Sequence, residues 1–216
     1  MLNNSRSDGV KHLSIVAMVA DEAYCAFKYL TLQRLSSLEI SCAAGRGEEV
    51  IEDIMWKEWD EQHIVDFFGR STGSSVTSLS LRYVPISGEQ LLQLLWLMPA
   101  LCYLRVEESS SDQLTITNRT ITQPFLQRLT IDIQDSSPSF LPKLTNIGLV
   151  LREDGLVENM LPSALISRLI PDDLKFEVGV ECIKSVEVIL IAASEETVGV
   201  LKSKLQLKME GFGDLA

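Results

Sequence analysis

The chain has 216 residues, of which 46% are hydrophobic, and it carries a formal net charge of −11. That hydrophobic share is ample for a packed core and excludes the class of disordered chains. The negative charge argues against nucleic acid or anionic membranes as partners, because both need a basic protein surface, and no apolar run reaches the roughly 20 residues of a membrane span.

A six-residue pattern, apolar-x-x-apolar-x-apolar, recurs seven times along the chain. The copies are Val10–Ile15, Leu35–Ile40, Val76–Leu81, Leu101–Val106, Leu126–Ile131, Leu144–Leu149 and Ile183–Val188. The last two apolar positions of each copy face the same side of an extended chain, since they are two residues apart. A strand this short buries that side only where neighbouring strands stack. The pattern therefore predicts seven parallel strands.

The connections between these strands read as helices, which is how parallel strands are usually joined. The predicted helices lie at residues 21–29, 48–68, 87–98, 157–169 and 195–207. Ser87 and Gln90 have the spacing of a capping box, and Pro99 closes that helix. The copies are 25, 41, 25, 25, 18 and 39 residues apart, and the step of 18 is too short for much helix. We therefore expect a loop at Asp135–Ser139.

Three of the steps fall in the range of about 20–29 residues that is typical of leucine-rich repeats. We therefore predict a single α/β domain over residues 1–216, an irregular leucine-rich-repeat-like solenoid with parallel strands on one face and helices on the other. Regular repeats place Asn or Cys three residues after the last strand position. Those positions hold Met18, Ala43, Val84, Ser109, Gln134, Arg152 and Ile191. This departure predicts an irregular arc rather than a regular horseshoe.

Several stretches resemble the divergent leucine-rich-repeat regions of fungal F-box-like proteins. They are Val76–Leu81, Leu97–Leu101, Phe140–Leu144 and Leu165–Arg168, within about residues 76–190. Such proteins pair an N-terminal F-box, which docks a ubiquitin-ligase adaptor, with repeats that capture a substrate. The resemblance implies a protein-binding module, the substrate-recognition part of an F-box-type ubiquitin-ligase receptor. Nine residues precede Val10, too few for an F-box, so we expect a truncated N-terminus or a chain without a ligase link of its own.

Alternate strand residues are expected to form rows across the open face of the sheet. One row would run His12, Ser37, Ser78, Tyr103, Arg128, Asn146 and Ser185. The next would run Ser14, Glu39, Ser80, Arg105, Thr130, Gly148 and Glu187, and a third Val16, Ser41, Arg82, Glu107, Asp132, Val150 and Ile189. In these rows Arg82, Tyr103, Arg105 and Arg128 fall on neighbouring strands. Because Tyr and Arg are enriched in binding hot spots, these four are our candidate protein-binding residues, for an unidentified protein partner in the cytoplasm or nucleus. A simply solvated sheet face is the competing interpretation.

Catalytic patterns are weak in this sequence. The Gly69–Ser75 loop is rich in Gly and Ser but lacks the Lys and the following helix of a phosphate loop. Neither His12 nor His63 lies in a nucleophile signature. We therefore expect no enzyme. The alternatives are an α/β enzyme whose site is built from loops such as Gly69–Ser75 or carboxylates such as Asp132, and a degenerate fragment without independent function.

The chain contains four scattered cysteines, Cys25, Cys42, Cys102 and Cys182. They form no C-x-x-C pair, and zinc needs clustered ligands. Buried free thiols in a reducing compartment are the expected state. We predict neither a metal site nor a cofactor site. Trp56, Trp59 and Trp96 are expected to pack under the sheet rather than to bind a cofactor.

The repeat predicts that Leu129 lies in the middle of the core. Replacing Leu129 with Ala is therefore expected to lower the free energy of unfolding by roughly 2–5 kcal/mol, the usual cost of a large-to-small core substitution. Urea denaturation of the wild-type and Leu129→Ala proteins measures this difference. An unchanged midpoint would mean that Leu129 is not in a packed core.

Overall fold

The computed structural model describes residues 9–17, 19–43, 59–71, 73–108, 119–132, 139–152, 155–169 and 179–191, with 198–199, 201 and 203. Its strands are β1 (His12–Ala17), β2 (Ser37–Cys42), β3 (Ser78–Arg82), β4 (Tyr103–Glu107), β5 (Asn146–Arg152) and β6 (Ser185–Ile191). Its helices are α1 (Ala20–Tyr29), α2 (Glu61–Arg70), α3 (Gly88–Trp96), α4 (Gln123–Leu129) and α5 (Gly155–Ser167).

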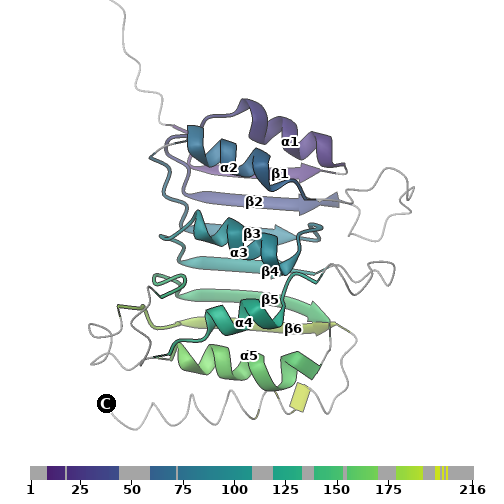
Figure 1. Ribbon diagram of the computed structural model, residues 1–216, viewed down its shortest axis with the longest axis vertical. Helices are drawn as coiled ribbons and strands as arrows, with labels where there is room; N and C mark the ends of the chain where they lie inside the picture. The colour runs from purple at the N-terminus through teal and green to yellow at the C-terminus, as the bar shows by residue number, and fades with distance from the viewer. Residues whose placement is uncertain are drawn as a thin grey trace, which may run out of the picture.

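The six strands form one sheet in which every neighbouring pair is parallel and the spatial order follows the chain from β1 to β6. Helices α1 to α5 lie on the same face of this sheet, side by side in chain order (Figure 1). The predicted α/β class, with parallel strands in one layer and helices in the other, is therefore confirmed.

The pairing of the strands follows the repeated pattern. Leu38 pairs with Leu13 on one side and with Leu79 on the other, and Leu104 pairs with Leu79 and with Ile147. The central apolar residues of the sheet on the helix-facing side are almost fully buried: Leu38, Ile40, Leu79, Leu81, Leu104, Val106, Ile147 and Leu149. Burial weakens at the last strand, where Val186 is partly exposed. Six of the seven predicted strand cores are thus correct.

The prediction of a strand at Leu126–Ile131 is wrong, because Gln123–Leu129 form α4. Apolar residues three apart share a face of a helix as well as fitting the repeat pattern. Phe125, Leu126 and Leu129 are all buried on that face. Leu129 is therefore a core residue, as the stability prediction requires, although it belongs to the helix layer.

The remaining helix predictions hold in part. The helices at 21–29 and 87–98 are confirmed as α1 and α3, and α3 has the predicted capping box between Ser87 and Gln90. The helix predicted at 157–169 is α5, which begins at Gly155. Of the helix predicted at 48–68, residues 48–58 lie outside the described part. The described remainder begins only at Glu61, where the Asp60 side chain accepts from the N–H of Gln62 at 2.9 Å.

Two further predictions fall largely on residues that the structure does not describe. Within the helix predicted at 195–207, Val198, Gly199, Leu201 and Ser203 are helical and the other positions lie outside the described part. In the loop predicted at Asp135–Ser139, only Ser139 is described, and it belongs to neither a helix nor a strand.

A hydrogen-bond ladder at the amino ends of the strands fixes their register. The carbonyl oxygen of Lys11 accepts from the N–H groups of Ser36 at 2.8 Å and Ser37 at 2.9 Å. The same double acceptance repeats at the carbonyl oxygens of Ser36, Thr77, Cys102 and Thr145. The hydroxyl groups of Ser36, Thr77 and Thr145 donate to the same carbonyl oxygens as their own N–H groups do. The side-chain hydrogen bonds that support the register thus come from Ser and Thr residues just before the strands.

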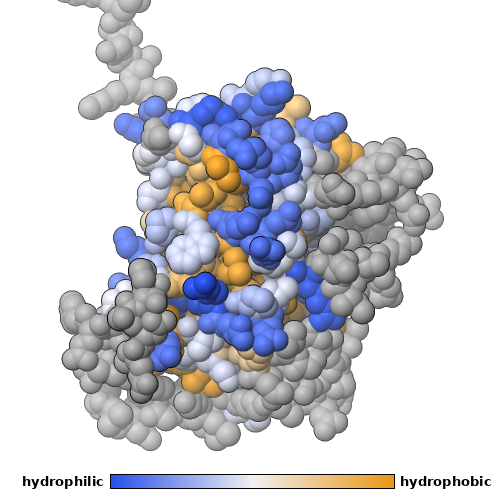
Figure 2. Space-filling view, viewed as in Figure 1, coloured by the Kyte–Doolittle hydropathy of each residue, from blue (hydrophilic) through white to orange (hydrophobic). Residues whose placement is uncertain are grey.

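The outer side of the helix layer is mostly hydrophilic, with hydrophobic surface showing between the helices (Figure 2). Trp96 is half-exposed on α3, where its ring meets that of Phe140 edge to face with centroids 5.4 Å apart. The prediction that Trp96 packs under the sheet is therefore wrong. It is confirmed for Trp59, which is buried, and Trp56 lies outside the described residues.

Arg168 is the largest fully buried side chain of the described residues. It directly follows α5 and donates from Nε to the Leu129 carbonyl at 2.6 Å, from Nη1 to the Leu141 carbonyl at 3.0 Å and from Nη2 to the Phe140 carbonyl. Its own carbonyl accepts from the N–H of Ile183 at 3.1 Å. Burial lowers the pKa of Arg168 to about 10, which leaves the guanidinium charged at neutral pH. One side chain therefore joins the ends of α4 and α5 to the turn before β5.

Replacing Arg168 with Met is expected to lower the free energy of unfolding by at least about 3 kcal/mol. The reason is that three buried carbonyl groups lose their donors, and each unsatisfied group costs roughly 1–3 kcal/mol. Replacing Arg168 with Lys should recover only part of the loss, since an ammonium group lacks the planar fork that reaches all three carbonyls. Urea denaturation checks both variants, and a Lys variant as stable as wild type would contradict this role.

Candidate functional site

Three rows of side chains cross the face of the sheet that the described helices leave uncovered. The strand register places them in line: His12, Ser37, Ser78, Tyr103, Asn146 and Ser185; then Ser14, Glu39, Ser80, Arg105, Gly148 and Glu187; then Val16, Ser41, Arg82, Glu107, Val150 and Ile189. The predicted rows are therefore confirmed at every position except those assigned to the strand that is in fact α4.

Three of the four candidate residues lie together. Arg82 is at the end of β3, and Tyr103 and Arg105 are on the neighbouring β4. The prediction that Arg128 joins them is wrong, because Arg128 is an exposed residue of α4 and Tyr103 pairs directly with Asn146. Arg128 therefore belongs to the helix layer, on the other side of the sheet.

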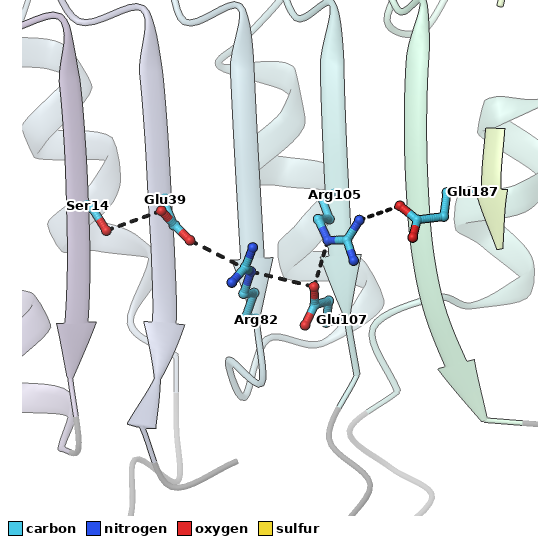
Figure 3. Close-up of polar contacts among 6 residues, drawn as sticks. All are labelled: Ser14, Glu39, Arg82, Arg105, Glu107 and Glu187. Atoms are coloured by element: carbon cyan, nitrogen blue, oxygen red, sulfur yellow. Dashed lines mark hydrogen bonds and ion pairs between the residues drawn. The ribbon is translucent and has the colours of Figure 1, made fainter. Parts of the chain in front are cut away.

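The middle of the open face is a chain of polar contacts that spans the sheet from β1 to β6 (Figure 3). It begins with Ser14, whose hydroxyl donates to Glu39 at 3.3 Å. Arg82 Nε lies 3.7 Å from Glu39 and 3.5 Å from Glu107. Arg105 continues the chain on the neighbouring strand.

Arg105 is held by two carboxylates. Its Nε donates to Glu107 at 2.6 Å, and its Nη1 donates to Glu187 on β6 at 2.5 Å. The bond to Glu107 is the main factor that raises the pKa of Arg105 above its ordinary value; burial opposes it and Glu187 reinforces it. Charge-assisted bonds of this length are the stronger kind of hydrogen bond in proteins. Arg105 is therefore a fixed part of the face.

Arg82 is held much more loosely than Arg105. Its side chain is 36% exposed, against 19% for Arg105, and its Nε is within ion-pair distance of two carboxylates but makes no hydrogen bond. Ser80 on the same strand also has a buried hydroxyl without a hydrogen-bond partner in the structure. Tyr103 is 37% exposed. Arg82 and Tyr103 are thus the candidate residues that an incoming molecule meets.

Four further residues of this face were not among the predicted binding residues: the three carboxylates Glu39, Glu107 and Glu187, and Gly148. All four occur in the predicted rows, so the signal was present in the alternation of the strands. The sequence did not reveal that β4 pairs directly with β5, because the pattern at Leu126–Ile131 suggested a strand between them. With that strand in place, Arg105 and Glu187 would be three strands apart instead of two.

Apolar residues also reach the open face near its edges. Val16 on β1 and Ile189 on β6 are exposed, and Val150 on β5, which pairs with Ile189, is half-buried. The face therefore combines a charged centre with apolar side chains at both ends of the third row.

The residues considered for catalysis are not brought together. His12 bonds to Ser37 at 2.9 Å on the open face, whereas His63 on α2 contacts Asp60 at 3.0 Å and stacks on Tyr24. The first two residues of the predicted Gly69–Ser75 loop are the end of α2, and the Ser71 hydroxyl directly after them accepts from the N–H of Leu32 at 3.0 Å.

Groups of side chains that would hold a metal ion are missing from the described residues. The four cysteines are thiols outside any disulfide, and Cys42 alone among them is buried, so the expectation of buried thiols fails for Cys25, Cys102 and Cys182. None of the helices in the described part of the chain has the length and apolar character to cross a membrane.

A scan against protein-family models found no match, and searches of curated proteins and of solved structures found no similar protein.

The two arginines are expected to differ in their contribution to folding. Replacing Arg105 with Ala should lower the free energy of unfolding by about 1–3 kcal/mol, because Glu107, whose side chain is only 10% exposed, loses its hydrogen-bond donor. Replacing Arg82 with Ala should cost less than about 1 kcal/mol, as is usual for exposed ion pairs. Urea denaturation of both variants tests the order, and equal losses would contradict it.

Proposed function

We propose that this chain is a protein-interaction module that holds its partner on the open face of the parallel sheet. The observation that carries the proposal is the one-sided covering of the sheet. Parallel sheets are almost always covered by helices on both faces, but all five described helices lie on one face (Figure 1). The other face exposes Arg82 and Tyr103 beside an organised chain of charges.

The charges of this face favour a protein partner over nucleic acid. Arg82 and Arg105 both lie against carboxylates, so neither is an isolated cation that would neutralise a phosphate. Nucleic-acid binding depends on such neutralisation. A protein partner can use the exposed Arg82 and Tyr103, because Arg and Tyr are enriched in the binding hot spots of protein interfaces.

We further propose that the architecture is an irregular leucine-rich-repeat-like solenoid. Its support is the strand order, which follows the chain without exception, and the return of the chain through the helix layer between strands. The pairs β1–β2 and β3–β4 join residues 25 positions apart, for example Leu13 with Leu38 and Leu79 with Leu104. In such stacks the strand face commonly binds the partner.

The cellular role that we propose is substrate recognition for an F-box-type ubiquitin-ligase receptor. It rests on the resemblance of the repeat segments together with the strand face described above. Two of those segments are joined in the structure, since Arg168 donates to the carbonyl groups of Phe140 and Leu141. The role requires a non-enzymatic protein whose open face selects the bound substrate.

A double variant, Arg82→Ala with Tyr103→Ala, tests the binding face. Both side chains are partly exposed, so their removal should leave the fold intact while deleting the two accessible hot-spot residues. For proteins that co-purify with the wild-type chain, we expect the bound amount to fall about tenfold or more in the double variant. A tenfold loss corresponds to roughly 1.4 kcal/mol of binding free energy. Quantitative mass spectrometry of matched purifications measures the loss.

Arg128→Ala is the matched control, because Arg128 is an exposed arginine of the helix layer. The set of bound proteins should be the same for this variant as for the wild type. Circular dichroism confirms that all variants are folded. Identical protein sets for the double variant and the wild type would overturn the proposed face.

A further inference from the structure

Gly148 lies at the point where the polar chain crosses β5. In the strand register, Arg105 of β4 pairs with Gly148, and Gly148 pairs with Glu187 of β6. Arg105 nevertheless bonds to Glu187 at 2.5 Å, although the two residues are on strands that are not neighbours. The contact between Arg105 and Glu187 therefore lies over β5 at Gly148. Figure 3 shows this reach across the intervening strand.

The space that Arg105 occupies is the space that a side chain at position 148 would fill. A Cβ atom placed on Gly148 would lie 3.3 Å from Arg105 Nη1, 3.4 Å from Arg105 Cγ and 3.7 Å from Glu187 Oε2. The first distance is shorter than an ordinary van der Waals contact, so the Arg105 guanidinium would have to give way by a few tenths of an ångström. Arg105 has little freedom to yield, because its Nε is also bonded to Glu107 at 2.6 Å.

Glycine is an unfavourable choice for the interior of a strand on local grounds. It loses more conformational entropy on folding than other residues and has no side chain to pack, and in strands it often marks a close approach. The φ of Gly148 lies outside the left-handed region, so backbone conformation does not require a glycine there. The close approach of the Arg105 side chain therefore explains why position 148 is a glycine.

We propose that Gly148 is the positioning residue of the open face: the missing side chain leaves the space over β5 in which Arg105 and Glu187 meet. This inference deepens the proposed binding function, on which it rests for the identity of the face. The glycine at position 148 thereby determines which charged side chains are exposed to a partner. Arg105 is held down in the face, while Arg82 is left at 36% exposure and Glu187 at 52%.

The test measures how strongly Glu187 stabilises the fold when position 148 is changed. Replacing Glu187 with Gln should lower the folding equilibrium constant about threefold in the Gly148 protein, as expected for a partly exposed ion pair. The effect should be smaller with Gly148→Ala and absent with Gly148→Val, in which a branched side chain fills the path of Arg105. Valine is otherwise a favourable strand residue, so a general loss of strand propensity does not explain that result.

Gly69→Ala provides the matched control. Gly69 lies in α2, and an added Cβ there meets no atom within 4 Å. Glu187→Gln should keep its threefold effect in this background. The same threefold effect in the Gly148→Val background would overturn the proposal.

A second measurement does not depend on comparing stabilities. In the wild-type and Gly69→Ala proteins, the bond to Glu187 should slow rotation of the Arg105 guanidinium and give separate Nη resonances in NMR spectra. In Glu187→Gln these resonances should merge, and in Gly148→Ala they should exchange faster than in the wild type. Separate Nη resonances in the Glu187→Gln protein would overturn the proposal even if Gly148→Val fails to fold.

Both measurements use the free chain, so they separate the two proposals. Suppose that the Arg82 and Tyr103 variant loses its partners but substitution of Gly148 leaves the Arg105 resonances unchanged. The proposed binding face would then be supported, and the proposed role of Gly148 would be wrong. The opposite pair of results would leave Gly148 as a residue that organises the sheet face, and the proposed binding function would fall.

Discussion

The need to bury one side of every strand governs the rest of this structure. Each strand contributes two or three apolar side chains to the helix-facing side, and a strand this short cannot bury them alone. In-register stacking solves this problem by placing Leu38 beside Leu79 and Leu104 beside Ile147. Because side chains alternate along a strand, the same register lines up the opposite side as well. The polar rows of the open face are therefore a geometric result of core formation.

The sequence was sufficient to predict the α/β class, six strands and their alignment, because the apolar pattern specifies both the strand and the side that is buried. It failed at Leu126–Ile131, where apolar residues at spacing three also suit a helix. Pro124, in the first turn of α4, and the anomalous step of 18 residues were the available warnings. Without the false copy, the step from Leu104 to Ile147 becomes 43 residues, enough for a helix and its loops.

The candidate site was predictable only as a set of positions. Arg82, Tyr103 and Arg105 were placed correctly because they share strand faces, whereas Arg128 depended on the false strand. The pairing of Arg105 with Glu187 depends on which strands are two apart, and that knowledge comes from the three-dimensional order. Arg168 was equally hidden, since no pattern in the sequence distinguishes a buried arginine from an exposed one.

The bridge over β5 also affects how the molecule can come apart. In a one-dimensional array each unit is stabilised by its immediate neighbours, so units at the ends open first and the rest follow one at a time. Arg105 and Glu187 connect units that are next-nearest neighbours. β6 cannot leave without breaking a contact to β4 as well as those to β5. Opening of β6 alone therefore costs the Arg105–Glu187 contact in addition to the pairing with β5, by the modest amount that a partly exposed ion pair contributes.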